Sequence, residues 1–296
     1  MNDEVAGGLG TESIALTPSK TAYPFLLAVD SRTFGLPLLD LIEEVCYVVD
    51  SFQLHVPLPY GEPVLPSAEE VGKACPLLKD RSLTAIVHFA PDPRLGDSDA
   101  TERSAAQKAL ITSVERLKPL KPHAYVLELT IPDPFVRGTP RSIRDAVGDE
   151  ELALWKGRVV DSIRTASEAC RVPMPCFCIE TSTYPVAEIV DMIHREVLSY
   201  CIDVGTLFRF QYHITEHIVA YMSRTKVFHL HGISPAGEPH QSLEHFPHDH
   251  IVGFLGMLSA SHYSGSVVIE VRDRERLAES LRRCDRAYRE LRGLEI

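Results

Sequence analysis

Residues 175–205 read PCFCIETSTYPVAEIVDMIHREVLSYCIDVG and contain two short apolar runs with a longer stretch between them. The runs, 175–181 and 200–205, have the length and composition of buried strands. In the stretch from 185 to 198, apolar residues recur at the spacing of a helix. A strand, a helix and a second strand in this order predict parallel strands joined by a crossover helix.

The same unit repeats along the chain. Short apolar runs lie at 25–30, 46–52, 83–90, 124–130, 175–181, 200–205, 227–232 and 266–272. Helix-like stretches lie at 36–45, 66–78, 102–117, 150–170, 185–198, 215–223, 250–262 and 274–291. Ser67, with Glu70 three residues later, predicts a capping box at the start of the second helix. Eight alternations in 296 residues favour an α/β fold, a closed parallel (β/α)8 TIM barrel formed as a single domain by residues 23–296. An open doubly wound sheet is the alternative.

Composition and charge restrict the class of protein. The chain is 45% hydrophobic and 24% charged, so it can bury a large core. Its net charge of −11 argues against a nucleic-acid partner, because nucleic acids are bound mainly through basic side chains. No apolar run reaches the roughly 18 residues that a membrane span needs, so we expect no membrane partner. A homo-oligomer is compatible with the sequence.

Residues 1–22 are expected to form a flexible N-terminal tail. Acidic residues stand where a secretory signal needs basic ones, and no apolar signal core follows. The seven cysteines are scattered, and Cys176 and Cys178 share one face of an expected strand, where they would not pair easily. We therefore expect reduced thiols and a cytoplasmic protein.

Polar residues end six consecutive apolar runs. In a parallel barrel the active site lies at the carboxyl ends of the strands, so these side chains should gather at one mouth. A buried carboxylate there costs on the order of several kcal/mol unless it is paired or bound to a cation. Oxygen and imidazole donors without thiolates suit Mn²⁺, Zn²⁺, Fe²⁺ or Co²⁺. The residues at the run ends are His88, Glu128, Glu180, Asp203, His229 with His231, and Glu270.

Four of these residues form a pattern that resembles the xylose isomerase-like barrel superfamily, which includes the apurinic endonucleases and the sugar epimerases. They are Glu180 in "IETS", Asp203 in "IDVG", His229 in "HLHG" and Glu270 in "IEVR". The resemblance extends over about residues 25–290 and implies that these four side chains hold one divalent metal ion.

The endonuclease pattern itself is incomplete. Where that family has a histidine three residues after the aspartate of strand 6, this chain has Thr206. Its later D-x-H is replaced by Glu238-Pro239-His240. Together with the negative charge, these departures argue against a DNA-repair enzyme.

The motifs "CIDVG", "HLHG" and H-x-S-L at 240–243 resemble the CbiR-type cobamide-remodelling hydrolases most closely. The resemblance implies a metal-dependent phosphodiesterase that hydrolyses the phosphoribosyl bond in the nucleotide loop of a cobamide, such as cobalamin (vitamin B12), during remodelling and salvage. The partner would then be a small corrinoid substrate. The alternative is a metal-dependent sugar or sugar-phosphate isomerase or epimerase, and a non-catalytic binding barrel is a third class.

Each candidate residue receives an expected role. Glu180 and Glu270 ligate the metal and position a water, and they would equally serve as the acid and base of an epimerase. His231 and His240 protonate the leaving oxygen or hold the phosphate. His88 and Glu128 bind substrate or a second ion. Arginines 137, 141 and 144, in the Pro-rich and Gly-rich loop 131–149, either contact phosphate or corrin amides or form a solvated basic loop.

The two histidines of "VFHLHG" (227–232) are expected to have different functions. They share one face of a strand, because side chains two residues apart point the same way. His229 is expected to lie deeper and to ligate the metal. His231 is expected about 6–7 Å further along the strand, too far for the same ion but close to a substrate bound to it.

Overall fold

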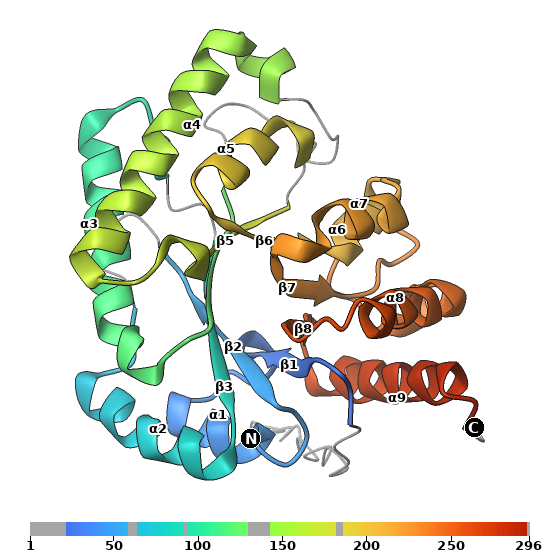
Figure 1. The fold of residues 1–296 in the computed structure, drawn as a ribbon. Coiled ribbons are helices and arrows are strands. Elements are labelled where there is room, and N and C mark those ends of the chain that lie inside the picture. The colour runs from blue at the N-terminus through green and yellow to red at the C-terminus, as the bar shows by residue number, and fades with distance from the viewer. Residues whose placement is uncertain (1–21, 59–63, 91–93, 130–142, 182–185, 295–296) are drawn as a thin grey trace, which may run out of the picture.

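The computed structural model describes residues 22–58, 64–90, 94–129, 143–181 and 186–294, with side chains from 147 onward in the fourth range. Within these ranges eight parallel strands pair in sequence order and close into a barrel surrounded by helices (Figure 1). The pairing of β1 with β8, which begins at Leu26 and Ser266, closes it. The closed (β/α)8 barrel that the sequence predicts is therefore confirmed, and the open sheet is excluded.

The strands are short, and the helices on the outside vary in length. The strands are β1 (Leu26–Asp30), β2 (Ser51–Val56), β3 (Thr84–Phe89), β4 (Ala124–Leu127), β5 (Phe177–Glu180), β6 (Ser199–Asp203), β7 (Thr225–Leu230) and β8 (Ser266–Ile269). The α-helices are α1 (Leu38–Val45), α2 (Ala68–Arg81), α3 (Ala100–Leu117), α4 (Ile143–Cys170), α5 (Val190–Arg195), α6 (Val204–Arg209), α7 (Ile214–Tyr221), α8 (His248–Ala260) and α9 (Arg274–Leu291). Ser67 and Glu70 form the expected capping box of α2.

The second strand is displaced from its predicted position at 46–52. It begins only at Ser51, because α1 ends at Val45 and a turn follows it. Val48 and Val49 in this turn are buried in the core between helix and barrel, so hydrophobicity does not mark the start of the strand. As a result, the true strand end carries Gln53 and His55, which the prediction placed outside it.

Several helices also differ from expectation. A short helix, α6, starts directly after β6 and precedes the predicted one, which is α7. Helix α4 reaches back to Ile143, into part of the predicted loop 131–149, with a kink at Gly148. Residues 130–142 of that loop, and the proposed tail 1–21, lie outside the described residues.

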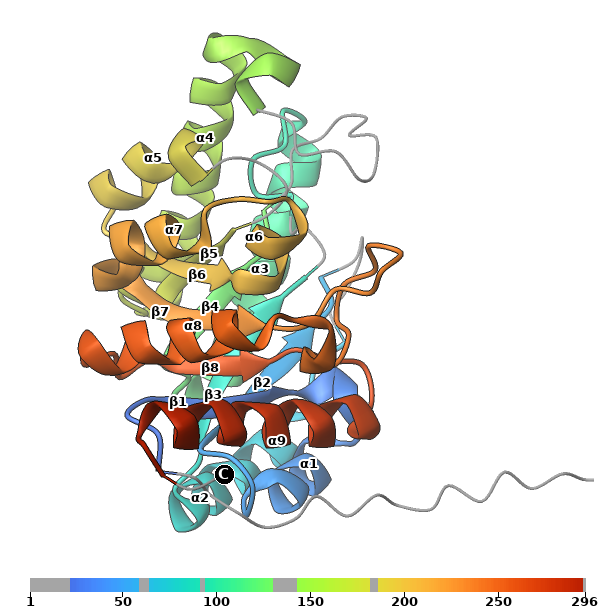
Figure 2. The ribbon, with the colours of Figure 1, turned by 90° about the vertical axis from the view of Figure 1, so that its right-hand side faces the viewer.

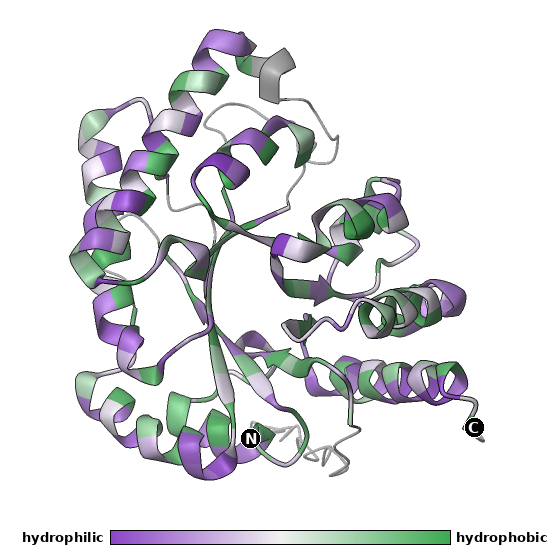
Figure 3. Cartoon of the chain, in the orientation of Figure 1, coloured by the Kyte–Doolittle hydropathy of each residue, from purple (hydrophilic) through white to green (hydrophobic). Residues whose placement is uncertain are grey.

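The helices pack on the barrel through one apolar face each. Along α9 the buried residues Leu277, Ser280, Cys284 and Tyr288 recur at helical spacing, and charged residues occupy the other side. Figure 3 shows this mixture of hydrophobic and hydrophilic residues along the outer helices. In the view of Figure 2, α8 and α9 cover β8 and β1, and these strands point to the same edge of the barrel.

The barrel interior consists of a small apolar layer beneath a polar one. The apolar layer contains Ala28, Ile86, Ala124, Val126, Cys178, Cys201, Val227 and Val268, all fully buried. Seven of them precede a polar residue by two positions, as Cys178 precedes Glu180 and Val227 precedes His229. Because side chains two apart share a strand face, the polar residues lie directly above this layer, at the carboxyl ends of the strands.

The cysteines and the membrane prediction can both be compared with the structure. All seven cysteines are free thiols, and Cys178 and Cys201 fill the barrel interior. Among the described helices none has the length and apolar composition needed to cross a membrane.

Candidate metal centre

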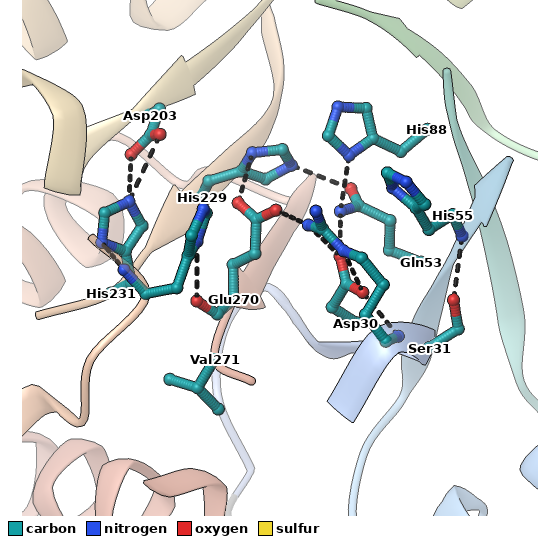
Figure 4. Close-up of polar contacts among 12 residues, drawn as sticks. Asp30, Ser31, Gln53, His55, His88, Asp203, His229, His231, Glu270 and Val271 are labelled. Carbon is teal, nitrogen blue, oxygen red and sulfur yellow. Dashed lines mark hydrogen bonds and ion pairs between the residues drawn. The ribbon is translucent and has the colours of Figure 1, made fainter. Parts of the chain in front are cut away.

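Four of the predicted residues converge at the barrel mouth. One ligand atom each from Glu180, Asp203, His229 and Glu270 lies within 4.8 Å of every other. His229 Nδ1 is 2.7 Å from Glu180 Oε1 and 3.1 Å from Glu270 Oε2. All four side chains are buried, so water does not offset their charge. Figure 4 shows His229, Glu270 and Asp203 reaching this point from β7, from just after β8 and from β6.

Electrostatics keep these carboxyls ionised. Burial alone would raise the pKa of Glu180, but the charge of His229 and the hydrogen bonds from His229 and His88 hold that pKa well below the usual value. Burial would likewise raise the pKa of Asp203, which His231 instead holds at about 2. Three buried carboxyl groups and a buried imidazole are a donor set that fits a divalent cation. These four residues are hereafter called the tetrad.

Metal affinity should rise with pH. Burial would lower the pKa of His229, but Glu180 and Asp203 raise it above its usual value, which favours a proton on the ring nitrogen that faces the tetrad. A metal must displace this proton. Below the raised pKa of His229, each pH unit should weaken metal affinity by up to roughly tenfold, and above it this dependence should vanish. Calorimetric titration in buffers of different ionisation enthalpy should detect the released proton. A metal affinity that does not change with pH below the pKa of His229 would contradict this assignment.

His88 and Glu128 lie beside the tetrad. His88 is buried, and its Nε2 is 3.0 Å from Glu180 Oε2. Ligand-type atoms of His88, Glu128 and Glu180 form a second group with the spacing of a metal site. The structure thus brings both predicted residues to the mouth.

His231 lies outside the tetrad but contacts one of its members. Its Nε2 is 3.2 Å from Asp203 Oδ1, and the backbone N–H of His240 donates to its Nδ1 at 3.1 Å. The rings of His231 and His240 are 4.7 Å apart. Gly205, the glycine of "CIDVG", makes room for this arrangement, because a Cβ there would lie 2.3 Å from the His231 ring.

Thr206, which stands where the endonuclease pattern has a histidine, holds Asp203 in place. Its backbone N–H donates to Asp203 Oδ1 at 2.9 Å and its hydroxyl donates to Oδ2 at 2.7 Å. Asp203 therefore also caps the N-terminus of α6. The position contributes two hydrogen bonds to a tetrad carboxylate in place of a ligand.

Four residues on or just after β1 and β2 were missed by the sequence analysis, namely Asp30, Arg32, Gln53 and His55. The guanidinium of Arg32 forms two hydrogen bonds with the carboxylate of Asp30 and pairs with Glu270 of the tetrad. Gln53 connects Asp30 to the histidines of the centre. Asp30 gave a usable signal, since it ends the apolar run FLLAVD, whereas the displaced second strand hid Gln53 and His55.

Other predicted residues are not placed at the site. Arg137 and Arg141 lie outside the described residues, as does the side chain of Arg144. Substrate contacts by these arginines therefore stay predictions.

Comparisons with known proteins indicate the fold. No family model matches the sequence, and no curated protein matches it. Among solved structures, a D-psicose 3-epimerase from Clostridium cellulolyticum H10 is similar at 17% identity and a TM-score of 0.65, over 91% of this chain and 99% of that one. A 3-keto-D-glucoside 4-epimerase from E. coli gives 15% and 0.64 over 91% and 99%. Endonuclease IV from Thermus thermophilus gives 15% and 0.65 over 90% and 99%. The chain thus shares its barrel fold with these two sugar epimerases and with endonuclease IV.

Proposed function

We propose that this chain is a metal-dependent isomerase or epimerase of a sugar or sugar phosphate. The tetrad is the observation that carries the proposal, because it places two glutamates from different sides of the barrel around one cation position. Similarity of fold to several sugar epimerases is consistent with it. The hydrolase that the sequence motifs favoured becomes the second candidate.

The chemistry follows from the position of the two glutamates. A bound dication would polarise the carbonyl and hydroxyl oxygens of the substrate and acidify the adjacent C–H. Glu180 ends β5 and Glu270 follows β8, and each directs one oxygen at His229 Nδ1. A substrate carbon between them would face a carboxylate on each side. One glutamate removes the proton and the other returns it from the opposite face.

The surroundings distinguish the two glutamates. Glu270 gives its second oxygen to Arg32, whereas Glu180 gives its second oxygen to His88. The permanent charge of Arg32 favours the ionised form of Glu270. His88 is a neutral neighbour, because burial lowers its pKa. We therefore expect the charge of Glu270 to depend on Arg32 and that of Glu180 to depend on His229 and His88.

Hydrolysis of a cobamide phosphodiester is the second candidate, and the pair His231 and His240 favours it. Burial, together with His231 and Arg272, lowers the pKa of His240 to about 3, so His240 is neutral near pH 7 and can position a phosphate but cannot protonate a leaving group. His231 would then be the general acid. An epimerase that works with two glutamates has no need of this pair.

The two functions can be separated in one experiment. Purified protein, metal-loaded or treated with chelator, is incubated in D₂O with a panel of ketoses and ketose phosphates, and separately with a cobamide. We expect chelator-sensitive deuterium incorporation at the carbon whose configuration changes. Release of an α-riboside from the cobamide, without deuterium exchange in any sugar, would overturn the proposal in favour of hydrolysis.

A further inference from the structure

We propose that Gln53 is a positioning residue that fixes which ring nitrogen of His229 faces the tetrad and makes His88 a hydrogen-bond donor to Glu180. The proposal builds on the tetrad as a metal site and applies equally to a sugar or a cobamide substrate. It follows from the order of donors and acceptors along a buried chain of side chains (Figure 4).

The chain starts at Asp30, whose carboxylate can only accept. Asp30 is fully buried, and Arg32 donates to both of its oxygens, from Nε at 2.9 Å and from Nη2 at 2.8 Å. A buried carboxylate with a bidentate guanidinium partner is ionised. Any further polar neighbour of Asp30 must therefore be a donor.

That neighbour is the side-chain amide of Gln53, which is also fully buried. Its nitrogen is 3.0 Å from Asp30 Oδ2, so the NH₂ group must face Asp30. This fixes the orientation of the amide, because the carbonyl oxygen then points the other way. The oxygen lies 2.8 Å from Nε2 of His229.

A carbonyl oxygen accepts, so His229 must carry a hydrogen on Nε2. The thiol of Cys201 is the other polar group near this nitrogen, at 3.5 Å, but it is a weaker and more distant partner. The nitrogen left to lose its proton and bind a metal is Nδ1. This is the atom that lies 2.7 Å from Glu180 and 3.1 Å from Glu270.

The second hydrogen of the Gln53 amide sets the state of His88 in the same way. The amide nitrogen lies 3.2 Å from His88 Nδ1, which must accept. Neutral His88 then carries its hydrogen on Nε2 and donates to Glu180 Oε2 at 3.0 Å. Every hydrogen-bonding atom of the Gln53 side chain except one lone pair is used.

The same arrangement of hydrogen-bond donors and acceptors disfavours an alternative metal site near β1 and β2. Asp30, His55 and His88 also have the spacing of a metal group. However, Arg32 and Gln53 already donate to Asp30, and Gln53 donates to His88 Nδ1. The positive charge near β1 and β2 is thus supplied by Arg32, so that of these two groups the tetrad at β5 to β8 is the one open to a metal.

Two substitutions distinguish the hydrogen-bonding role of the Gln53 amide from its role in packing. Gln53→Met preserves the shape and removes the acceptor for His229. Gln53→Glu preserves the acceptor for His229, and its second oxygen, facing Asp30, holds one proton, so that it keeps the hydrogen bond to Asp30 but loses the one to His88. We expect Gln53→Met to weaken metal affinity by about 10–100-fold, the usual effect of losing such a partner, and Gln53→Glu to stay within about threefold of the native protein.

The decisive readout is the histidine tautomer in the metal-free protein. Long-range ¹H–¹⁵N correlation spectra, recorded above the pH at which His229 titrates, should show a hydrogen on Nε2 in the native protein and in Gln53→Glu. In Gln53→Met, which lacks the acceptor at Nε2, the hydrogen should move to Nδ1, which faces Glu180 and Glu270. Ser51→Ala, which removes another buried hydrogen bond from β2, to Thr84, is the control and should change neither quantity. An unchanged tautomer and affinity in Gln53→Met would overturn the proposal. Because the spectrum needs neither metal nor substrate, this outcome is independent of the proposed function.

Discussion

His229→Ala is expected to abolish metal binding and activity together, whereas His231→Ala should keep the metal and, if the reaction is hydrolysis of a cobamide, lose turnover by roughly 10²–10⁴-fold. His229 belongs to the tetrad, and its Nδ1 lies at the centre between Glu180 and Glu270. His231 touches only Asp203 within the tetrad, and Asp203 keeps both hydrogen bonds from Thr206 when His231 is removed. Metal content by plasma mass spectrometry, measured beside the rate, separates the two effects.

Matched controls make the comparison specific. Asp203→Ala should behave like His229→Ala and lose metal and activity together, because it removes another member of the tetrad. His217→Ala alters a histidine on α7 that faces Tyr212 and Tyr221, away from the mouth, and should change neither quantity. Retention of metal and of a near-native rate in His229→Ala would remove the metal site on which both candidate functions depend. A near-native rate in His231→Ala would exclude this residue as the general acid of the hydrolase.

The fold could be predicted because the signal for it is repeated. Each alternation of a short apolar run and a helical stretch is weak alone, but eight in succession leave few architectures. The tetrad could be predicted for a related reason. Glu180, Asp203 and Glu270 each interrupt or end a buried strand, and a charge in that position needs a partner.

The residues of the site on and just after β1 and β2 could not be predicted from the sequence in this way. Gln53 is neutral and sits in an apolar strand whose start the buried turn at Val48 and Val49 conceals. Arg32 lies just beyond β1, in a short 3-10 helix, where a sequence shows only a common basic residue. Its partners Asp30 and Glu270 are 2 and 238 residues away in the chain, and only closure of the barrel through β1 and β8 brings all three together.

Arg32→Met is expected to destabilise the metal-free protein by about 3–5 kcal/mol, the usual effect of removing one partner from a buried ion pair. Asp30 is fully buried and Glu270 is 2% exposed, so both carboxylates would lose their cation. The Arg32 side chain itself is 23% exposed, which places the effect toward the lower end of this range. Arg274→Met, which breaks a more exposed pair with Glu44, is the control and should cost about 0.2–1 kcal/mol.

Acidic pH and a bound metal should each reduce the loss of stability caused by Arg32→Met, and together they test the role of Arg32 as the local cation. Burial would raise the pKa of Asp30, but Arg32 holds that pKa below its usual range. The ion pair therefore stabilises the folded protein above the ordinary carboxyl pKa of about 4, and this stabilisation is lost as the pH falls below that value. The variant should therefore differ most from the native protein near neutral pH and least in acid, where Asp30 can protonate. A metal in the tetrad would supply positive charge to Glu270 but not to Asp30. It should therefore reduce the difference in the free energy of unfolding between the native protein and Arg32→Met, measured by chemical denaturation. If this difference in stability is the same at all pH values, with and without metal, Arg32 contributes packing alone.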